Sequence, residues 1–334
     1  MSQTSRSLNI LVTGASGFLG QNLVPRLVDL GHKVRTFGRS QYLPASLDKL
    51  NLNHYSGDIT NFDEVSKAVS GTEIVYHLAG LVSYKKRDLD KAHAVNVIGT
   101  RNVMQASLKA NVKRVIHTSS VAAFGIPKDG EIGSEEIEYN LSGMGLTYCD
   151  TKHLAEQEVL KCVSSGLPAV ILNPGIIFGE GDTHPHHHAI FAAMSKGWMI
   201  GVPSGGVTFS DINDVVEAYI HCLDKGKIGE RYAVVSANLS FKDAALVFAK
   251  LNSLNGPLFE IPNNFLIGLG TVVESILPVF GIDPPLTRQV AWLSQQKIFF
   301  SSDKAYADIN FRPTPFADTV RRTSSYYLNR RKAS

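Results

Sequence analysis

The sequence predicts an α/β fold, in which a doubly wound parallel sheet carries helices on both faces and adjoins a smaller C-terminal lobe. Three observations lead to this prediction. Short apolar runs alternate with helical patterns through the first half of the chain, a glycine turn follows the first run, and the alternation ceases near residue 182. Such alternation is typical of a parallel sheet, and two such halves make a nucleotide-binding Rossmann fold.

The strands are expected where short runs are rich in β-branched and apolar residues, as buried parallel strands are. These runs are residues 8–13, 32–37, 53–59, 73–79, 113–120, 167–173 and 231–236. Helical patterns separate most of them. The first helical pattern is expected to stop at Leu30, because Gly31 follows it.

The chain is expected to divide near residue 182. We expect residues 1–182 to form a dinucleotide-binding domain and residues 183–334 to form a substrate-binding lobe, with part of 206–236 returning to the main sheet. Such a lobe would lie over the carboxyl edge of the sheet, where ligands bind in open α/β folds.

Composition limits the classes of function. The chain of 334 residues is 44% hydrophobic and has a formal net charge of +3, which gives no reason to expect a nucleic-acid partner. Its three cysteines are widely spaced, which favours reduced thiols over a disulfide framework, and the polar N-terminus does not resemble a signal peptide. We therefore expect a cytoplasmic protein.

Two further segments need interpretation. Residues 265–282 form the most apolar stretch, but Glu274 and Pro278 interrupt it, whereas a bilayer span needs about 20 apolar residues. We expect a buried or surface-docked helix and no integral membrane span, and leave peripheral membrane contact open.

The histidines within residues 184–188 lack a Cys or paired carboxylate at ligand spacing, so we expect them to bind no metal. Lining of the substrate cleft is their alternative role.

The glycine turn predicts a dinucleotide site. It follows the first strand directly and opens the first helix, with three glycines at regular spacing. The first permits a tight turn, the second lets the backbone approach a pyrophosphate, and the third allows close packing of helix on strand. The helix N-terminus adds N–H donors. The expected contributors are Gly14, Ser16, Gly17, Phe18, Leu19 and Gly20.

The end of the second strand bears on which dinucleotide binds. NAD sites usually carry an acidic residue there, which accepts a hydrogen bond from the ribose 2′-hydroxyl. Here Gly38 occupies that position and Arg39 follows it. An arginine suits a 2′-phosphate by its charge and its fork of donors. The sequence therefore favours NADP(H), with NAD(H) as the alternative.

The end of the third strand is expected to lie beside the adenine, through Asp58 and Ile59. Asp58 has a second expected role, as the cap of the helix that begins near Phe62. Later in the chain, Asp211 or Asn213 is expected to cap another helix.

Tyr148 and Lys152 lie four positions apart in a stretch that reads as helix, so their side chains share one face. Hydride transfer to a carbonyl needs a proton donor for the oxygen, and tyrosine, with a pKa of about 10, is a poor acid/base at neutral pH unless that pKa falls. We expect the Lys152 ammonium to lower the pKa of Tyr148 and to hold the nicotinamide ribose. Ser119 or Ser120, at the end of a predicted strand, would supply a hydroxyl to polarise the substrate oxygen.

The glycine turn, the Ser-Ser strand end and Tyr-x-x-x-Lys, in this order, resemble the extended short-chain dehydrogenases/reductases over almost the whole chain. In that family the catalytic serine lies three positions before a Val-Tyr-Gly-like triplet. Residues 123–125, Ala-Phe-Gly, stand in that place, so the resemblance implies Ser120 and not Ser119. Family habit also implies a homodimer.

The resemblance implies further cofactor contacts. The segment after the fourth strand, a supporting asparagine and a Pro-containing strand end match positions that line the family's cofactor cleft. These residues are Leu78, Ala79, Gly80, Asn96, Pro174 and Ile177. Within the family, the chain is similar to dihydroflavonol reductases and hydroxysteroid-dehydrogenase-like proteins, and the former imply contact of Arg39 with the NADP phosphate.

We therefore expect an NADP(H)-dependent oxidoreductase that moves a hydride between the nicotinamide and a carbonyl or secondary alcohol of a small, hydrophobic substrate. Ser120, Tyr148 and Lys152 would be its catalytic residues. The alternatives are a sugar-nucleotide epimerase with tightly bound NAD and a non-catalytic NADP-sensing module. The approach to Tyr148 and the Asn173-Pro174 pair differ from the sugar-nucleotide epimerases, and "TSSV" replaces the acid pair of the dehydratases.

Overall fold

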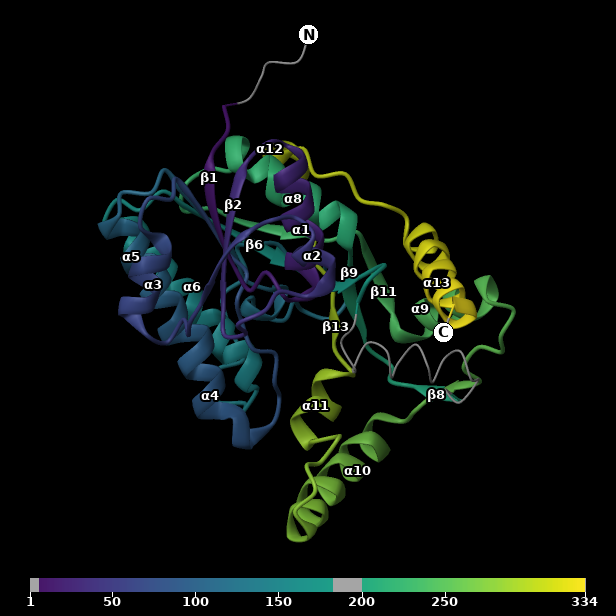
Figure 1. Ribbon diagram of the computed structural model, residues 1–334. Coiled ribbons are helices and arrows are strands. Elements are labelled where there is room, and N and C mark those ends of the chain that lie inside the picture. The colour runs from purple at the N-terminus through teal and green to yellow at the C-terminus, as the bar shows by residue number, and fades with distance from the viewer. Residues whose placement is uncertain (1–5, 183–199, 334) are drawn as a thin grey trace.

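The computed structural model describes residues 6–182 and 200–333, and its centre is a parallel sheet of seven strands (Figure 1). The spatial order is β10-β6-β5-β4-β1-β2-β3, and every neighbouring pair is parallel. The strands are β1 (Asn9–Thr13), β2 (Lys33–Gly38), β3 (Asn53–Ser56), β4 (Ile74–His77), β5 (Arg114–Thr118), β6 (Ala169–Pro174) and β10 (Arg231–Val234). The doubly wound sheet predicted from the sequence is confirmed.

Five of the seven strands lie inside the runs that predicted them, and β2 and β6 end one residue beyond theirs, at Gly38 and Pro174. Alternate residues enter opposite faces, because side chains alternate along a strand. Leu11 and Val75, for example, are paired in register and belong to the core on one face, whereas Ile10 and Tyr76 belong to the core on the other. Burial on both faces explains why these strands are continuously apolar.

Helices cover the two faces. The first face packs against α1 (Phe18–Asp29), α8 (Ile212–Lys225) and α12 (Asp303–Ile309), and the second against α3 (Phe62–Val69), α5 (Gly99–Lys109) and α6 (Thr147–Ser164). The short helices α2 (Ala45–Asp48) and α4 (Leu89–His93) lie in connections. As expected, α1 gives way to Gly31, whose φ of +84° is the left-handed conformation that glycine adopts easily.

The second half of the chain adds two smaller sheets. One consists of β7 (Ile176–Phe178), β9 (Gly206–Asp211), β11 (Ala237–Ser240) and β13 (Lys297–Ile298), and the other pairs β8 (Gly201–Val202) with β12 (Phe259–Glu260). The other helices of the described residues are α9 (Phe241–Leu251), α10 (Asn263–Ile276), α11 (Arg288–Leu293) and α13 (Phe316–Ala333). Although β10 follows the small-sheet strand β9, it joins the main sheet beside β6. The domain boundary at residue 182 stays a prediction.

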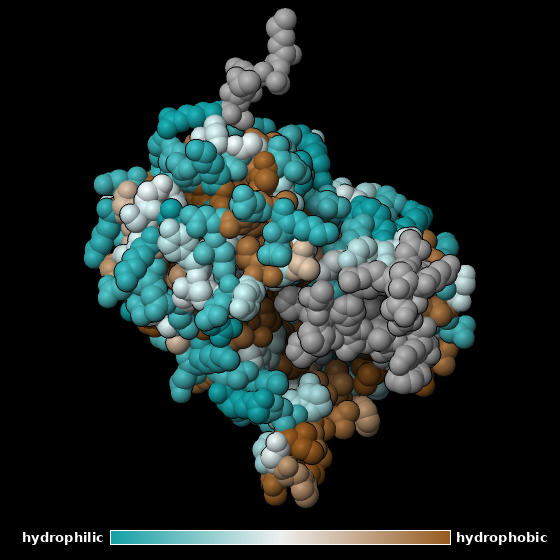
Figure 2. Space-filling model, in the orientation of Figure 1, coloured by the Kyte–Doolittle hydropathy of each residue, from teal (hydrophilic) through white to brown (hydrophobic). Residues whose placement is uncertain are grey.

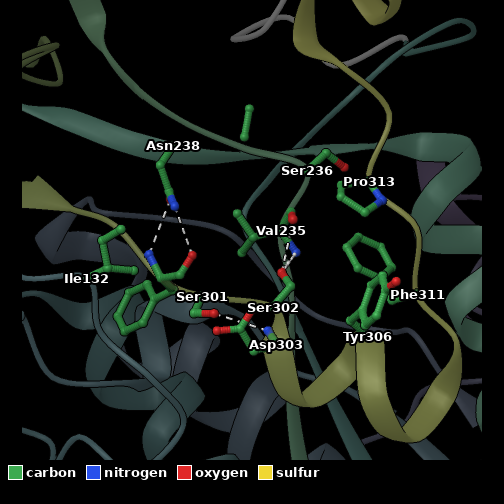
Figure 3. Close-up of a pocket in the computed structure, with 12 residues that line it drawn as sticks. Ile132, Val235, Ser236, Asn238, Ser301, Ser302, Asp303, Tyr306, Phe311 and Pro313 are labelled. Atoms are coloured by element: carbon green, nitrogen blue, oxygen red, sulfur yellow. Dashed lines mark hydrogen bonds between the residues drawn. The ribbon is translucent and has the colours of Figure 1, made fainter.

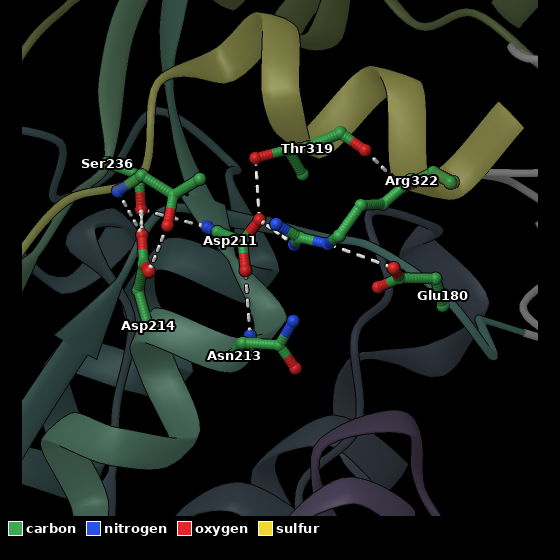
Figure 4. Close-up of polar contacts among 9 residues, drawn as sticks. Glu180, Asp211, Asn213, Asp214, Ser236, Thr319 and Arg322 are labelled. Carbon is green, nitrogen blue, oxygen red and sulfur yellow. Dashed lines mark hydrogen bonds and ion pairs between the residues drawn. The ribbon is translucent and has the colours of Figure 1, made fainter. Parts of the chain in front are cut away.

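Buried Asp211 ties the C-terminal helix α13 to the strand–helix junction of β9 and α8 (Figure 4). It caps α8 by accepting from the Asn213 backbone N–H at 2.8 Å, which confirms the expectation of a cap. Its carboxylate also accepts from the Thr319 hydroxyl at 2.6 Å and pairs with Arg322. Arg322 in turn bonds Glu180 at 2.9 Å, so the network closes the junction between the two halves.

The apolar stretch 265–282 is helical, in α10 and the 3-10 turn Leu277–Phe280. It is not a buried helix, because only 11% of the window Asn263–Phe280 is buried. In the described residues this window is the one helix long and apolar enough to cross a membrane by length and composition. Figure 2 shows it as a hydrophobic projection from an otherwise mixed surface.

Candidate active site

The glycine turn brings β1, α1 and the loop after β4 into close contact. Gly14 has a φ of +71°, and a Cβ on it would lie 2.6 Å from the backbone nitrogen of Ala79. A Cβ on Gly20 would lie 2.5 Å from the carbonyl oxygen of Ala15. Both positions therefore require glycine for the backbone to pass as it does.

The N-terminus of α1 has the properties of an anion site. Gly17 is the N-cap and makes no side-chain cap hydrogen bond, so the first N–H groups of the helix lack a side-chain acceptor. The described first turn, which begins with Phe18 and Leu19, contains no acidic residue. Free N–H donors and the helix dipole fit a pyrophosphate at this turn. Ser16 is exposed beside it.

Arg39 is exposed where β2 ends. Across residues 6–182 and 200–333 the structure gives its guanidinium neither a hydrogen bond nor an ion pair. Gly38 presents no carboxylate, and no described atom lies within 4 Å of the place where a Cβ would stand. This strand end thus offers a free cation and open space.

Asp58 does not cap α3, so that expectation is wrong. Asn61 caps the helix, accepting from the backbone N–H groups of Asp63 and Glu64. Asp58 lies one turn earlier and accepts from the Thr60 N–H at 2.9 Å in a tight local turn. An asparagine directly before the helix outcompetes a residue further away, because the cap must lie next to the first turn.

Ile59 is 7% exposed and packs on Gly99 of α5, where a Cβ would come within 2.6 Å of its side chain. Its carbonyl accepts from the Asn102 side chain at 2.9 Å. The segment after β3 is therefore held against α5 at the same carboxyl edge of the sheet as the glycine turn.

Ser120 and Tyr148 meet at the start of α6. Ser120 lies after β5, and its hydroxyl accepts from the Ala122 N–H at 3.2 Å and donates to the Pro174 carbonyl at 3.5 Å. Burial raises the pKa of Tyr148 to about 12, and a hydrogen bond with Ser120 opposes that rise. Ser119 is buried, and its hydroxyl has no partner among the described residues. Of the two serines, Ser120 is the one beside Tyr148.

Lys152 lies one turn along α6 and is only 6% exposed. Its Nζ donates to the Thr118 carbonyl at 2.9 Å. Burial lowers the pKa of Lys152 to about 8, and the charge of Glu156 opposes this. A Cβ on Gly80 would be 3.4 Å from both the Lys152 Nζ and the Asn96 Oδ1. The loop after β4 therefore passes directly over the lysine.

The pKa of Tyr148 moves in the opposite direction from the one expected. It is raised by burial, and the groups that modify it are Ser120, which lowers it, and Cys149, which raises it. The ammonium of Lys152 is hydrogen-bonded to a backbone carbonyl on β5. Tyr148 therefore holds its proton at neutral pH, which suits a proton donor.

Asn96 lies in a π-helical turn, Ala94–Ile98, between α4 and α5. Its Oδ1 accepts from the Leu81 N–H at 2.7 Å, and its Nδ2 donates to the Leu81 carbonyl at 2.9 Å and to the Thr151 hydroxyl at 3.0 Å. Asn96 thus fixes the loop after β4 to α6. Single π-helical turns of this kind occur frequently at functional sites.

Pro174 and Ile177 lie where β6 passes into β7. Pro174 is buried, with its carbonyl facing Ser120, and Ile177 pairs in register with Ser210 of β9. Leu78 and Ala79 are half-buried beside the glycine turn. The structure therefore brings most predicted residues to one edge of the sheet, with Arg39 and Asp58 further along that edge, at the ends of β2 and β3.

A buried layer beneath the site was not predicted. His77, at the end of β4, bonds the Thr13 hydroxyl at 2.8 Å and the Thr100 hydroxyl at 3.0 Å. Burial, with a smaller effect from Lys152, lowers the pKa of His77 to about 3. The ring of His117 lies 5.2 Å away, and burial also lowers its pKa. Two neutral imidazoles thus underlie the lysine. The one available signal was their position near strand ends.

An apolar cluster adjoins Tyr148 and was also missed. It contains Tyr84, Ala122, Ile126, Tyr139, Leu141, Leu146, Cys149, Trp292 and Leu293. The cluster joins the loop after β4 to α11, which lies far away in sequence. The pocket in Figure 3, of about 430 Å³, is elsewhere, between β11 and α12, and none of the predicted site residues lines it.

The predicted histidine cluster lies outside the described residues. Among the residues that the structure describes, no group of three or more His, Cys, Asp or Glu could hold a metal ion.

Comparison with known proteins identifies the family to which the chain belongs. A family model for the NAD dependent epimerase/dehydratase family matches residues 10–235. The chain belongs to this family. It is an NAD(P)-dependent dehydrogenase/reductase, as the extended short-chain resemblance implied.

Individual relatives span almost the whole chain. It is 33% identical to sterol demethylase protein B from Methylococcus capsulatus, over 80% of this chain and 82% of the relative. It is 28% identical to a 3 beta-hydroxysteroid dehydrogenase/Delta 5-->4-isomerase from Mycobacterium tuberculosis, over 93% and 88%. The crystal structure of gox2253 matches with a TM-score of 0.84 at 31% identity, over 96% and 98% of the two chains.

Proposed function

We propose that this family member is an NADP(H)-dependent carbonyl reductase and alcohol dehydrogenase for an apolar substrate. One observation carries the proposal: the half-buried Tyr148 lies beside Ser120, keeps its proton at neutral pH because its pKa is raised to about 12, and lies one helical turn from the buried Lys152. The three side chains stand at the carboxyl edge of the sheet, where the glycine turn fits a dinucleotide.

The proposed chemistry follows from these groups. A bound nicotinamide supplies or accepts the hydride. Ser120 donates a hydrogen bond to the substrate oxygen and orients it, while Tyr148 gives its proton to the oxygen as negative charge develops. The Lys152 ammonium stabilises the phenolate that remains and holds the ribose hydroxyls. Oxidation of an alcohol follows the same steps in reverse.

The coenzyme preference rests on the end of β2. Gly38 stands where NAD sites usually carry an acidic residue. The exposed Arg39 that follows is unpaired across the described ranges 6–182 and 200–333. A guanidinium without a protein partner is suited to bind a 2′-phosphate. We therefore assign NADP(H) as the preferred coenzyme and Arg39 as its phosphate contact.

The substrate class rests on the surroundings of Tyr148. The neighbouring cluster is made largely of aliphatic and aromatic side chains, including Leu146 and Trp292. Such walls bind apolar molecules. Two relatives are named for sterols and hydroxysteroids, which agrees with an apolar ketone or secondary alcohol.

Compartment and assembly belong to the same proposal. The three cysteines are free and buried, which suits a reducing compartment such as the cytoplasm. We propose a homodimer on family habit alone.

The first test is NADPH consumption with a panel of aldehydes and ketones that includes apolar ring ketones. Tyr148→Phe should turn over at least about a hundredfold more slowly than wild type, because general acid catalysis accounts for a rate factor of that size. Tyr42→Phe, at an 81% exposed tyrosine far along the chain, is the matched control and should be fully active. Equal rates in wild type and Tyr148→Phe would overturn the mechanism.

The panel also separates the alternatives. A sugar-nucleotide epimerase returns the hydride to its substrate, so it would bind coenzyme and consume none. Tight NADPH binding with no turnover on any carbonyl would therefore favour the epimerase or the sensor over the reductase.

A further inference from the structure

Helix α10 carries an exposed apolar stripe at helical spacing. Phe265, Leu269, Val272 and Ile276 recur every three or four residues, so they line one face of the helix. The 3-10 turn and the residue after Gly281 continue the surface. Together these residues form what we call the apolar tip: Phe265, Leu269, Val272, Ile276, Val279, Phe280 and Ile282, each at least 42% exposed.

The opposite face of α10 is fixed to the protein. Leu266 is 7% exposed, and Gly270 approaches α11 so closely that a Cβ would lie 2.9 Å from the Thr287 carbonyl. Glycine thus permits close packing of α10 on the segment that begins α11. The apolar tip is therefore held outward, and Figures 1 and 2 show α10 projecting from the body with its hydrophobic surface uncovered.

Three polar side chains of α10, those of Thr271, Glu274 and Ser275, have partners within the protein. The Thr271 hydroxyl donates to the Ile267 carbonyl at 2.9 Å, and the Ser275 hydroxyl donates to the Thr271 carbonyl at 2.8 Å. Glu274 pairs with Lys86 at 2.6 Å. Hydroxyls that bond back to their own helix suit an apolar surrounding.

A basic collar surrounds the base of the tip and is formed by Lys85, Lys86 and Arg87. Lys85 pairs with Asp283 at 2.9 Å, and Arg87 pairs with the same carboxylate. The three bases of the collar thus outnumber the two acids with which they pair, Glu274 and Asp283. The collar side chains remain 42%, 71% and 64% exposed, so they can also reach a second anion.

We propose that the apolar tip and the basic collar dock the protein on the surface of an anionic phospholipid bilayer. An apolar helix face with cations at its rim is the chemistry that a bilayer interface recognises, since acyl chains accept the stripe and anionic headgroups accept the collar. The helix lies on the membrane and does not cross it. Crossing would strip α10 from α11 and break the ion pair of Glu274 with Lys86.

The same surface leads toward the active site. Trp292 and Leu293 of α11 belong to the apolar cluster beside Tyr148, and Tyr84 directly precedes the collar. An apolar substrate dissolved in the bilayer would then enter beside the apolar cluster. This consequence rests on the proposed function, whereas the docking itself does not.

Co-sedimentation with vesicles tests the docking, with no coenzyme or substrate present. Vesicles of phosphatidylcholine with phosphatidylglycerol should bind the wild-type protein more tightly than vesicles of phosphatidylcholine alone. Val279→Ser/Phe280→Ser should weaken binding at least about tenfold, because it removes two large apolar side chains from the interface. Tyr42→Ser/Ile228→Ser, at residues 81% and 55% exposed elsewhere, is the matched control and should bind as wild type does.

The collar has its own variant. Lys86→Gln/Arg87→Gln should reduce the advantage of anionic vesicles while leaving binding to neutral vesicles unchanged. Circular dichroism melts should be the same for all variants, since every changed side chain is exposed.

Three results would overturn the proposal. The wild-type protein does not sediment with either vesicle, or the tip and control variants bind equally. The third is a wild-type dimer in analytical ultracentrifugation that Val279→Ser/Phe280→Ser dissociates, which would assign the tip to a second copy of the chain. Because no turnover is measured, failure here is distinct from failure of the reductase assay.

Discussion

The ring of Tyr84 meets the ring of Tyr148 edge-on, with centroids 5.6 Å apart and planes inclined at 62°. Burial raises the pKa of Tyr84 well above its usual value, with a smaller effect of the neighbouring Cys149. A neutral aromatic edge therefore braces the proposed proton donor from the loop after β4. Edge-to-face pairs are worth about 1 kcal/mol beyond their buried area, which is enough to fix a ring orientation.

This contact predicts that Tyr84 positions Tyr148. Tyr84→Ala should lower kcat/KM for carbonyl reduction about tenfold, because the phenol loses its fixed orientation. Tyr84→Phe keeps the ring and should stay within about twofold of wild type. Steady-state kinetics and coenzyme titration measure both. A Tyr84→Ala enzyme with wild-type kcat/KM would reduce Tyr84 to a packing residue.

The buried Lys152 predicts the pH dependence of reduction. Burial lowers its pKa to about 8, so the side chain is an ammonium below that pH and neutral above it. The phenolate left by proton transfer needs the ammonium, so kcat/KM should fall as the pH rises through about 8. Tyr148, with its pKa raised to about 12, still holds its proton at that pH, so it does not cause this fall in kcat/KM.

A variant series identifies the titrating group. Arginine does not titrate in this range. The Lys152→Arg variant should therefore show no fall in kcat/KM near this pH, whatever its remaining activity. Lys161→Arg, the same change at an exposed position of α6, should still show the fall in kcat/KM. If kcat/KM of Lys152→Arg still falls near this pH, the titrating group is another one.

Arg39 predicts the coenzyme preference. Arg39→Ala should weaken NADPH binding about 10- to 100-fold, since it removes hydrogen bonds to a charged group, and should leave NADH binding unchanged. Gly38→Asp should shift the preference toward NADH, because the open space at Gly38 accepts a carboxylate for the ribose hydroxyls. Fluorescence titration with both coenzymes measures this. Equal losses for NADPH and NADH in Arg39→Ala would contradict a phosphate contact.

The sequence alone predicted what depends on local pattern. Apolar runs and glycines decide where parallel strands and the dinucleotide turn form, so the sheet and the Gly14 turn could be read directly. The Tyr148–Lys152 pair could be read because helical spacing places both on one face. These features need no knowledge of distant contacts.

What the sequence did not predict depends on tertiary neighbours. The raised pKa of Tyr148 comes from burial, with a smaller effect of Cys149, and burial is not visible in a motif. The hydrogen bond of the Lys152 ammonium to the Thr118 carbonyl is equally invisible there. Tyr84 reaches the site from a loop without regular pattern. The sequence left residues 265–282 open between a buried and a surface-docked helix, because hydrophobicity alone favours burial, whereas α10 packs only one narrow face, around Gly270, on α11.

Gly14 predicts how strictly the dinucleotide turn needs glycine, and Gly31 provides the comparison. Both have a positive φ, +71° and +84°, but a Cβ on Gly14 would lie 2.6 Å from the Ala79 nitrogen, whereas one on Gly31 meets nothing within 4 Å. Gly31→Ala should therefore cost about 1 kcal/mol of unfolding free energy, from backbone strain alone. Gly14→Ala adds a backbone clash and should cost clearly more.

Urea unfolding and NADPH titration separate strain from function. Gly31→Ala should bind NADPH as wild type does, because Gly31 ends α1 far from the turn. Gly14→Ala should lose NADPH affinity at least about tenfold even under conditions where it remains folded, because the displaced loop at Ala79 carries Gly80 and its contact with Lys152. Equal costs and equal NADPH affinities in the two variants would mean that the close approach at Ala79 relaxes freely, and that only the backbone conformation at residue 14 matters.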